Sequence, residues 1–90
     1  MLYSIEYTTH ALKFLQALPR ETGEVLFDAI ERLVDNPKRK GSVRRGNTPS
    51  TFYVRVEARD QRYRVSYEIR EQRLVIIVLK VNEARVRRRQ

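Results

Sequence analysis

The sequence predicts an α+β fold: an N-terminal strand and a two-helix hairpin packed on a four-stranded, mainly antiparallel sheet, with a basic C-terminal tail. Two observations predict it. Apolar residues recur at helical spacing between residues 9 and 35, and on either side of that stretch they alternate with polar ones, as in strands. Ninety residues are the usual length of one domain, so we expect residues 1–90 to form it, with residues 83–90 as the tail.

The first strand is expected over residues 2–7. Its aromatic and apolar residues Tyr3, Ile5 and Tyr7 fall on one face, because side chains of a strand alternate between its two sides. Thr8 and Thr9 follow, and a threonine oxygen can accept a hydrogen bond from a free amide at the start of a helix. A helix is therefore expected to begin there.

Two amphipathic helices are expected next. The apolar stripe of the first is formed by Ala11, Phe14, Leu15 and Leu18, and Pro19 either ends this helix or opens the next. The second is expected from Glu21 to Asp35, with the stripe Val25, Leu26, Ala29, Ile30, Leu33 and Val34. Asn36-Pro37 ends it, because the residue before a proline avoids helical geometry.

Residues 38–51 are expected to form a loop, since they contain two of the three glycines, a proline and five bases. Three strands with short turns follow, and the first of these turns is expected around Ala58–Gln61. In the first, Phe52, Val54 and Val56 face one way, and Tyr53, Arg55 and Glu57 face the other. In the second, Tyr63, Val65, Tyr67 and Ile69 alternate with Arg62, Arg64, Ser66 and Glu68. Leu74–Val81 is almost wholly apolar, which is typical of a central strand, and we expect the N-terminal strand beside it.

Composition excludes several kinds of chemistry. The chain has no cysteine, so it forms no disulfide, thiolate zinc site or cysteine nucleophile. It has one histidine, His10, so a cluster of histidine metal ligands is excluded too. We expect no metal and no cofactor.

Charge is strongly asymmetric along the chain. The whole sequence has a net charge of +8, but residues 1–37 carry three bases and six acids, whereas residues 38–90 carry sixteen bases and five acids. Most of these bases are arginines, whose planar guanidinium group binds phosphate through paired hydrogen bonds. The second half therefore indicates a polyanionic partner, with a merely solubilising charge as the alternative.

No membrane association is expected. The longest purely apolar run, Leu74–Leu79, is far shorter than the roughly 20 residues of a membrane-spanning helix. The first residues lack the basic and then apolar pattern of a signal peptide, so we expect a cytoplasmic protein.

Candidate functional residues lie on the strands. The polar face of the expected hairpin presents Tyr53, Arg55 and Arg64, a combination that suits single-stranded RNA because guanidinium groups bind phosphate and aromatic rings stack on bases. Further basic residues expected to bind RNA are Arg44, Arg45, Arg59, Arg62 and Lys80. The alternative is a solvated polar face with cross-strand pairs such as Arg64 with Glu57, each of small energetic value.

Several short segments of the chain form one recognisable pattern between residue 2 and about residue 82. They are Tyr3-Ser4-Ile5-Glu6-Tyr7-Thr8, Ala11-Leu12-Lys13-Phe14-Leu15, Leu18-Pro19, Ala29-Ile30-Glu31, Asn36-Pro37, Gly41, Gly46 and, most specifically, Tyr63-Arg64-Val65-Ser66-Tyr67-Glu68-Ile69. Together these segments resemble the RelE/ParE superfamily of toxins from toxin–antitoxin systems.

The resemblance implies a RelE-like fold and one of several functions. RelE-like members are endoribonucleases that cut mRNA in the ribosomal A site without a metal, whereas ParE-like members inhibit DNA gyrase. A third possibility is a catalytically weakened homologue that only binds its antitoxin. In each case the resemblance implies a cognate antitoxin, RelB-like or other, and contact with operator DNA only through the antitoxin complex; the first also implies the ribosome and mRNA as partners.

The resemblance also assigns roles to individual residues. Arg64 matches the central arginine that holds the scissile phosphate, and Arg55 falls where the RelE pattern has a basic residue. Tyr53 falls where a second basic residue is often found. Arg85 stands one position later than the arginine that follows the last strand in the family, and no tyrosine comes after it. We therefore expect Arg64, Arg55 and Arg85 to be the catalytic residues.

Overall fold

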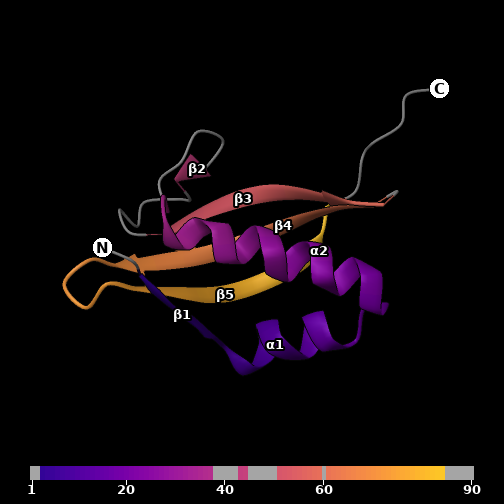
Figure 1. Ribbon diagram of the computed structural model, residues 1–90, viewed down its shortest axis with the longest axis horizontal. Helices are drawn as coiled ribbons and strands as arrows, with labels where there is room; N and C mark the ends of the chain where they lie inside the picture. Colours follow the sequence, from indigo (N-terminus) through magenta and orange to yellow (C-terminus); the bar gives the residue numbers. More distant parts are fainter. Residues whose placement is uncertain (1–2, 38–42, 45–50, 60, 85–90) are drawn as a thin grey trace.

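The α+β fold is confirmed by the computed structural model, which describes residues 3–37, 43–44, 51–59 and 61–84 (Figure 1). Its elements in chain order are β1 (Ser4–Tyr7), α1 (Thr9–Gln16), α2 (Arg20–Glu31), the 3-10 helix η1 (Arg32–Val34), β2 (Val43–Arg44), β3 (Thr51–Ala58), β4 (Gln61–Arg70) and β5 (Val75–Glu83). In space the strands follow the order β1-β5-β4-β3-β2. The prediction that the N-terminal strand lies beside the last strand is thus confirmed, and these two strands, β1 and β5, run parallel.

The sheet differs from expectation in one strand. The four expected strands form it, with antiparallel pairing from β5 to β3, and the two-residue strand β2 adds to the edge beside β3. Residues 43 and 44 belong to the segment expected as a loop. Two residues are too few to show the alternation that predicts a strand, so this element depends on pairing with β3.

Local sequence explains where the helices begin and end. The Thr8 hydroxyl accepts a hydrogen bond from the Ala11 amide at 3.1 Å and donates one to the Leu79 carbonyl at 2.7 Å, so one side chain both caps α1 and fastens it to β5. Pro19 directly precedes α2, as expected of a residue that opens a helix. The last turn of the expected second helix is the 3-10 helix η1. Of the helices that the structure describes, none is long and apolar enough to cross a membrane.

The core lies between the helices and one face of the sheet. In Figure 1, α2 extends along the strands; α1 packs against β5 and α2 against β3. The residues of β3 and β4 that were expected on this face are buried, among them Val54, Val65 and Tyr67, and so are Ile76 and Val78 of β5. The Tyr67 hydroxyl donates a buried hydrogen bond of 2.7 Å to the Pro37 carbonyl, which ties the chain after η1 to the sheet. Because the helices cover this face, the opposite one is left for function.

Candidate RNA-binding and catalytic site

The outer face of the sheet, turned away from the helices, gathers four of the residues expected in the site. Tyr53 and Arg55 of β3, Arg64 of β4 and Lys80 of β5 alternate with buried residues and are themselves exposed or half-buried. We call these four the outer-face cluster. They are neighbours across the ladder, because Tyr53 and Lys80 both stand opposite Ser66 and Arg55 stands opposite Arg64.

The pairing of Arg55 with Arg64 places two positive charges directly opposite each other. Cross-strand Cβ atoms in such a pair lie about 4.5–5.5 Å apart, and like charges at this spacing destabilise a sheet. Among the described residues, no carboxylate forms an ion pair with either arginine. The pair therefore creates a positive potential that an anion bound between the two would relieve.

Arg64 is held in place by an aromatic ring. Its Cζ atom lies 4.3 Å from the centroid of the Tyr53 ring, within the distance of a cation–π interaction. Its Nε atom is buried and has no hydrogen-bond partner in the described part of the chain. The guanidinium group is thus half-buried, fixed on one side by the ring, and retains hydrogen-bonding capacity that a phosphate oxygen could satisfy.

Arg62 and Arg59 have carboxylate partners. Arg62 forms an ion pair of 3.0 Å with Glu57, which stands opposite it in the ladder. The expected alternative pair of Arg64 with Glu57 is therefore wrong. Arg59 forms an ion pair with Glu21 in the first turn of α2. These side chains are largely exposed, and exposed pairs contribute little stability, so the RNA-binding role expected of both arginines remains a prediction.

Three expected site residues fall wholly or partly outside the described chain. The backbone of Arg44 lies in β2 opposite Phe52, but its side chain is outside the described part, as are Arg45 and Arg85. The chain is described as far as Ala84, whose amide donates a hydrogen bond of 2.7 Å to the Arg62 carbonyl. Residue 84 is thus fastened to the start of β4, which is also the end that carries Arg64. The expected catalytic role of Arg85 stays a prediction.

The phenol groups of the buried tyrosines are poor candidates for proton transfer. Burial raises the pKa of Tyr63, and the nearby carboxylate of Glu83 raises it further. Burial also raises the pKa of Tyr7, with a further contribution from Glu31. Both rings lie on the helix-covered side of the sheet, whereas the Tyr53 ring lies on the outer face.

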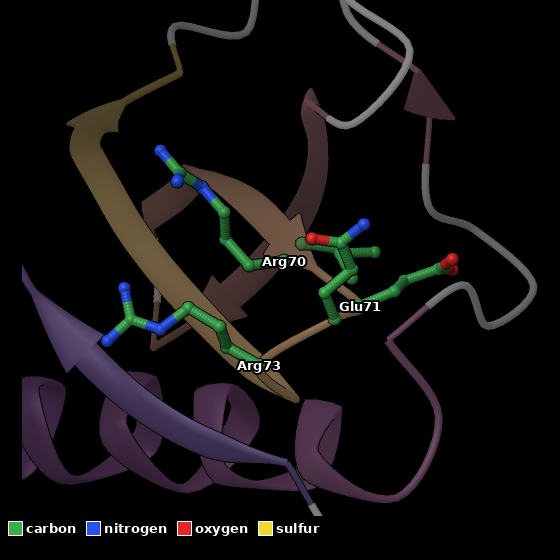
Figure 2. A pocket seen from close by; sticks show the side chains of 5 residues that line it. Arg70, Glu71 and Arg73 are labelled. Atoms are coloured by element: carbon green, nitrogen blue, oxygen red, sulfur yellow. The ribbon is translucent and has the colours of Figure 1, made fainter.

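A second basic feature, which the sequence did not predict, surrounds the turn from β4 to β5. A shallow pocket of about 270 Å³ is lined by Ile69, Arg70, Glu71, Gln72 and Arg73. Figure 2 shows the guanidinium groups of Arg70 and Arg73 on the same side of the turn, and the Glu71 side chain extending the other way. Arg70 also pairs with Glu68 at 3.1 Å. Arg70 lies six positions beyond Arg64 on β4, a distance of about 20 Å, so this pocket is not part of the outer-face cluster.

Several solved structures similar to this one are those of RelE-type toxins. The isolated E. coli RelE toxin is 22% identical, with a TM-score of 0.78 over 94% of this chain and 87% of that one. The toxin–antitoxin complex RelBE2 of Mycobacterium tuberculosis is 26% identical, with a TM-score of 0.76 over 93% of this chain and 100% of that one. The archaeal RelE–RelB complex of Pyrococcus horikoshii OT3 is 24% identical, with a TM-score of 0.71 over 92% of this chain and 96% of that one. The chain thus has the fold of RelE-type toxins.

The family follows from the sequence as a whole. Residues 5–87 match the model of the ParE toxin of type II toxin–antitoxin systems, parDE. The chain belongs to this family, and the resemblance seen in the sequence is confirmed. No curated protein sequence matches the chain. It is a toxin of a type II toxin–antitoxin system.

Proposed function

We propose that this toxin is a ribosome-dependent mRNA endoribonuclease whose outer-face cluster binds the phosphate at the cleavage site. The observation that carries the proposal is the Arg55–Arg64 pair, two guanidinium groups opposite each other with no carboxylate partner among the described residues. A phosphate between them would exchange a repulsive contact for two charge-assisted ones. The likeness in fold to RelE toxins supports the same function.

The proposed reaction is an attack of a ribose 2′-oxygen on the adjacent phosphorus. The P–O5′ bond breaks as the new bond forms, leaving a 2′,3′-cyclic phosphate and a 5′-hydroxyl. The phosphorane-like transition state carries extra negative charge on the non-bridging oxygens, so fixed cations accelerate the step. Arg64 and Arg55 are proposed to supply this charge, and Arg85 to act beside the leaving 5′-oxygen.

Proton transfer needs a base at the 2′-hydroxyl and an acid at the 5′-oxygen. An arginine has a pKa far above neutrality and performs neither role well. We therefore assign charge stabilisation to the arginines of the toxin and proton transfer to groups of the ribosome, which also places the action in the cytoplasm.

The test is cleavage of mRNA on a ribosome programmed with a defined A-site codon, read by primer extension. We expect a new end within that codon, lost at least 100-fold with Arg64→Ala. Arg20→Ala is the matched control, because it removes the same charge from an exposed residue of α2 and is expected to cleave normally. An intact message at toxin excess would refute the nuclease.

Inhibition of DNA gyrase is the alternative function that membership of the RelE/ParE superfamily leaves open. The two functions separate in cells that express the free toxin. Arrest with DNA-damage signalling and continuing protein synthesis would identify the gyrase function. Absence of any growth arrest would instead favour a homologue that only binds its antitoxin.

A cognate antitoxin is the proposed protein partner in every case. The similar toxins of M. tuberculosis and P. horikoshii were solved in complexes with antitoxins. In this chain an apolar hollow of about 330 Å³ lies between α1 and α2, lined in part by Leu15, Leu18, Gly23 and Phe27. We propose that the antitoxin covers this surface and the basic outer face, and that it alone contacts operator DNA. Copurification from cells that express both chains tests the partnership.

A further inference from the structure

We propose that Tyr53 is a positioning residue, whose ring orients the Arg64 guanidinium group toward the phosphate. This inference deepens the proposed nuclease function and rests on it. The sequence predicts that the Tyr53 ring stacks on an RNA nucleobase, and Tyr53 occupies a position where other family members often have a second basic residue. The structure indicates a different use, because one face of the ring is already occupied by Arg64.

The first step of the argument is the position of the ring. Tyr53 stands directly opposite Ser66, so it is the diagonal neighbour of Arg64 across the ladder. Diagonal neighbours lie about 7–8 Å apart at the backbone, within reach of an aromatic ring and an arginine. The guanidinium carbon lies 4.3 Å from the ring centroid, which is contact between the two groups.

The second step is what Arg64 lacks. Most of the arginines in the described part of the chain are oriented by carboxylates, as Arg62 is by Glu57 and Arg59 by Glu21. A carboxylate on Arg64 would occupy the hydrogen-bonding edge that a phosphate needs. A ring holds the guanidinium group by its face instead and leaves the donors of that edge available.

The third step is the charge opposite. Arg55 repels Arg64 and, without a restraint, would drive its flexible side chain toward solvent. The ring supplies that restraint, because its face is electronegative and attracts the cation. Ser66 lies between Tyr53 and Lys80 in the sheet. Because Ser66 is small and buried, the Tyr53 ring and the Lys80 side chain are the larger groups in this part of the outer face.

The test separates the ring from its hydroxyl. Tyr53→Leu removes the ring but keeps an apolar side chain, and Tyr53→Phe keeps the ring but removes the hydroxyl. In the programmed-ribosome assay under single-turnover conditions, we expect Tyr53→Leu to lower the cleavage rate about 5- to 30-fold, and Tyr53→Phe to recover it to within about 2-fold of the parent. Equal rates for the parent and Tyr53→Leu would overturn the proposal. An equal loss in both variants would overturn it too, because the hydroxyl would then be the functional group.

A second measurement does not depend on nuclease activity. A proton above an aromatic face is shifted upfield in NMR spectra, so the Arg64 side-chain protons should be upfield in the free parent toxin and in Tyr53→Phe. They should return to ordinary arginine values in Tyr53→Leu, with Arg64→Lys to assign the signals. Ordinary values in the parent would refute the ring contact, whereas absent cleavage with shifted signals would refute only the nuclease function. If Tyr53→Leu does not fold, Tyr53→Thr provides a strand-forming residue without a ring.

Discussion

The Arg55–Arg64 pair predicts that one substitution makes the toxin more stable and less active. Arg55→Gln removes one of two opposed charges and keeps a long polar side chain on β3. If the two charges lie about 6 Å apart, they repel by about 0.7 kcal/mol in a solvent of high dielectric constant. Favourable cross-strand pairs contribute about 0.2–1 kcal/mol, and like charges directly opposite each other are destabilising, so a penalty of this size is reasonable. We therefore expect the free energy of unfolding to rise by about 0.5 kcal/mol.

The assay is urea unfolding of the free toxin, with thermal unfolding beside it. For a domain of this length, about 0.5 kcal/mol corresponds to a rise of about 2–4 °C in Tm. The gain should nearly vanish in 1 M salt, where the screening length falls to about 3 Å. In the ribosome assay the same variant is expected to cleave at least 10-fold more slowly, because half of the charge on the proposed phosphate site is lost.

Two controls isolate the pair from net charge, since any lost arginine reduces the overall repulsion of a chain with a net charge of +8. Arg73→Gln removes an exposed arginine of the β4–β5 turn and should give a smaller gain. The single variants Arg55→Gln and Arg64→Gln and the double variant form a double-mutant cycle. Its coupling energy should show that the two arginines repel each other in the parent toxin. A gain for Arg55→Gln no larger than that for Arg73→Gln, or equal in 1 M salt, would refute the reasoning.

Two further predictions concern stability. Thr8→Ala should lower the free energy of unfolding by about 2 kcal/mol in urea, because it removes both the cap of α1 and the hydrogen bond to the Leu79 carbonyl, while Thr8→Ser should restore most of it. Burial and Glu83 raise the pKa of Tyr63, so the unfolded chain loses its phenolic proton first and stability should fall as the pH rises above about 10. Alkaline unfolding curves should show a smaller fall in Tyr63→Phe, and an unchanged fall would contradict this account.

The turn between β3 and β4 shows where prediction from the sequence stopped. The alternation of residues 52–57 and 62–69 correctly predicted which side chains share the outer face. The connection was expected over residues 58–61, but Ala58 pairs with Gln61, so it is two residues long and begins with Arg59 at a φ of 58°. A connection over residues 59–62 instead would have kept every side chain on its face but placed Arg64, and not Arg62, opposite Glu57. The periodicity determines the face, and the turn determines the neighbour.

The sequence by itself determined the order of the elements, the buried and outer faces and the basic character of the second half, because each depends on spacing or composition along the chain. The family could be predicted for the same reason. Only the tertiary structure decided that Arg64 contacts Tyr53, that Arg59 pairs with Glu21 of α2, and that Arg55 stands opposite Arg64. These contacts join separate elements, and their geometry depends on how the strands align and how the helices pack on them.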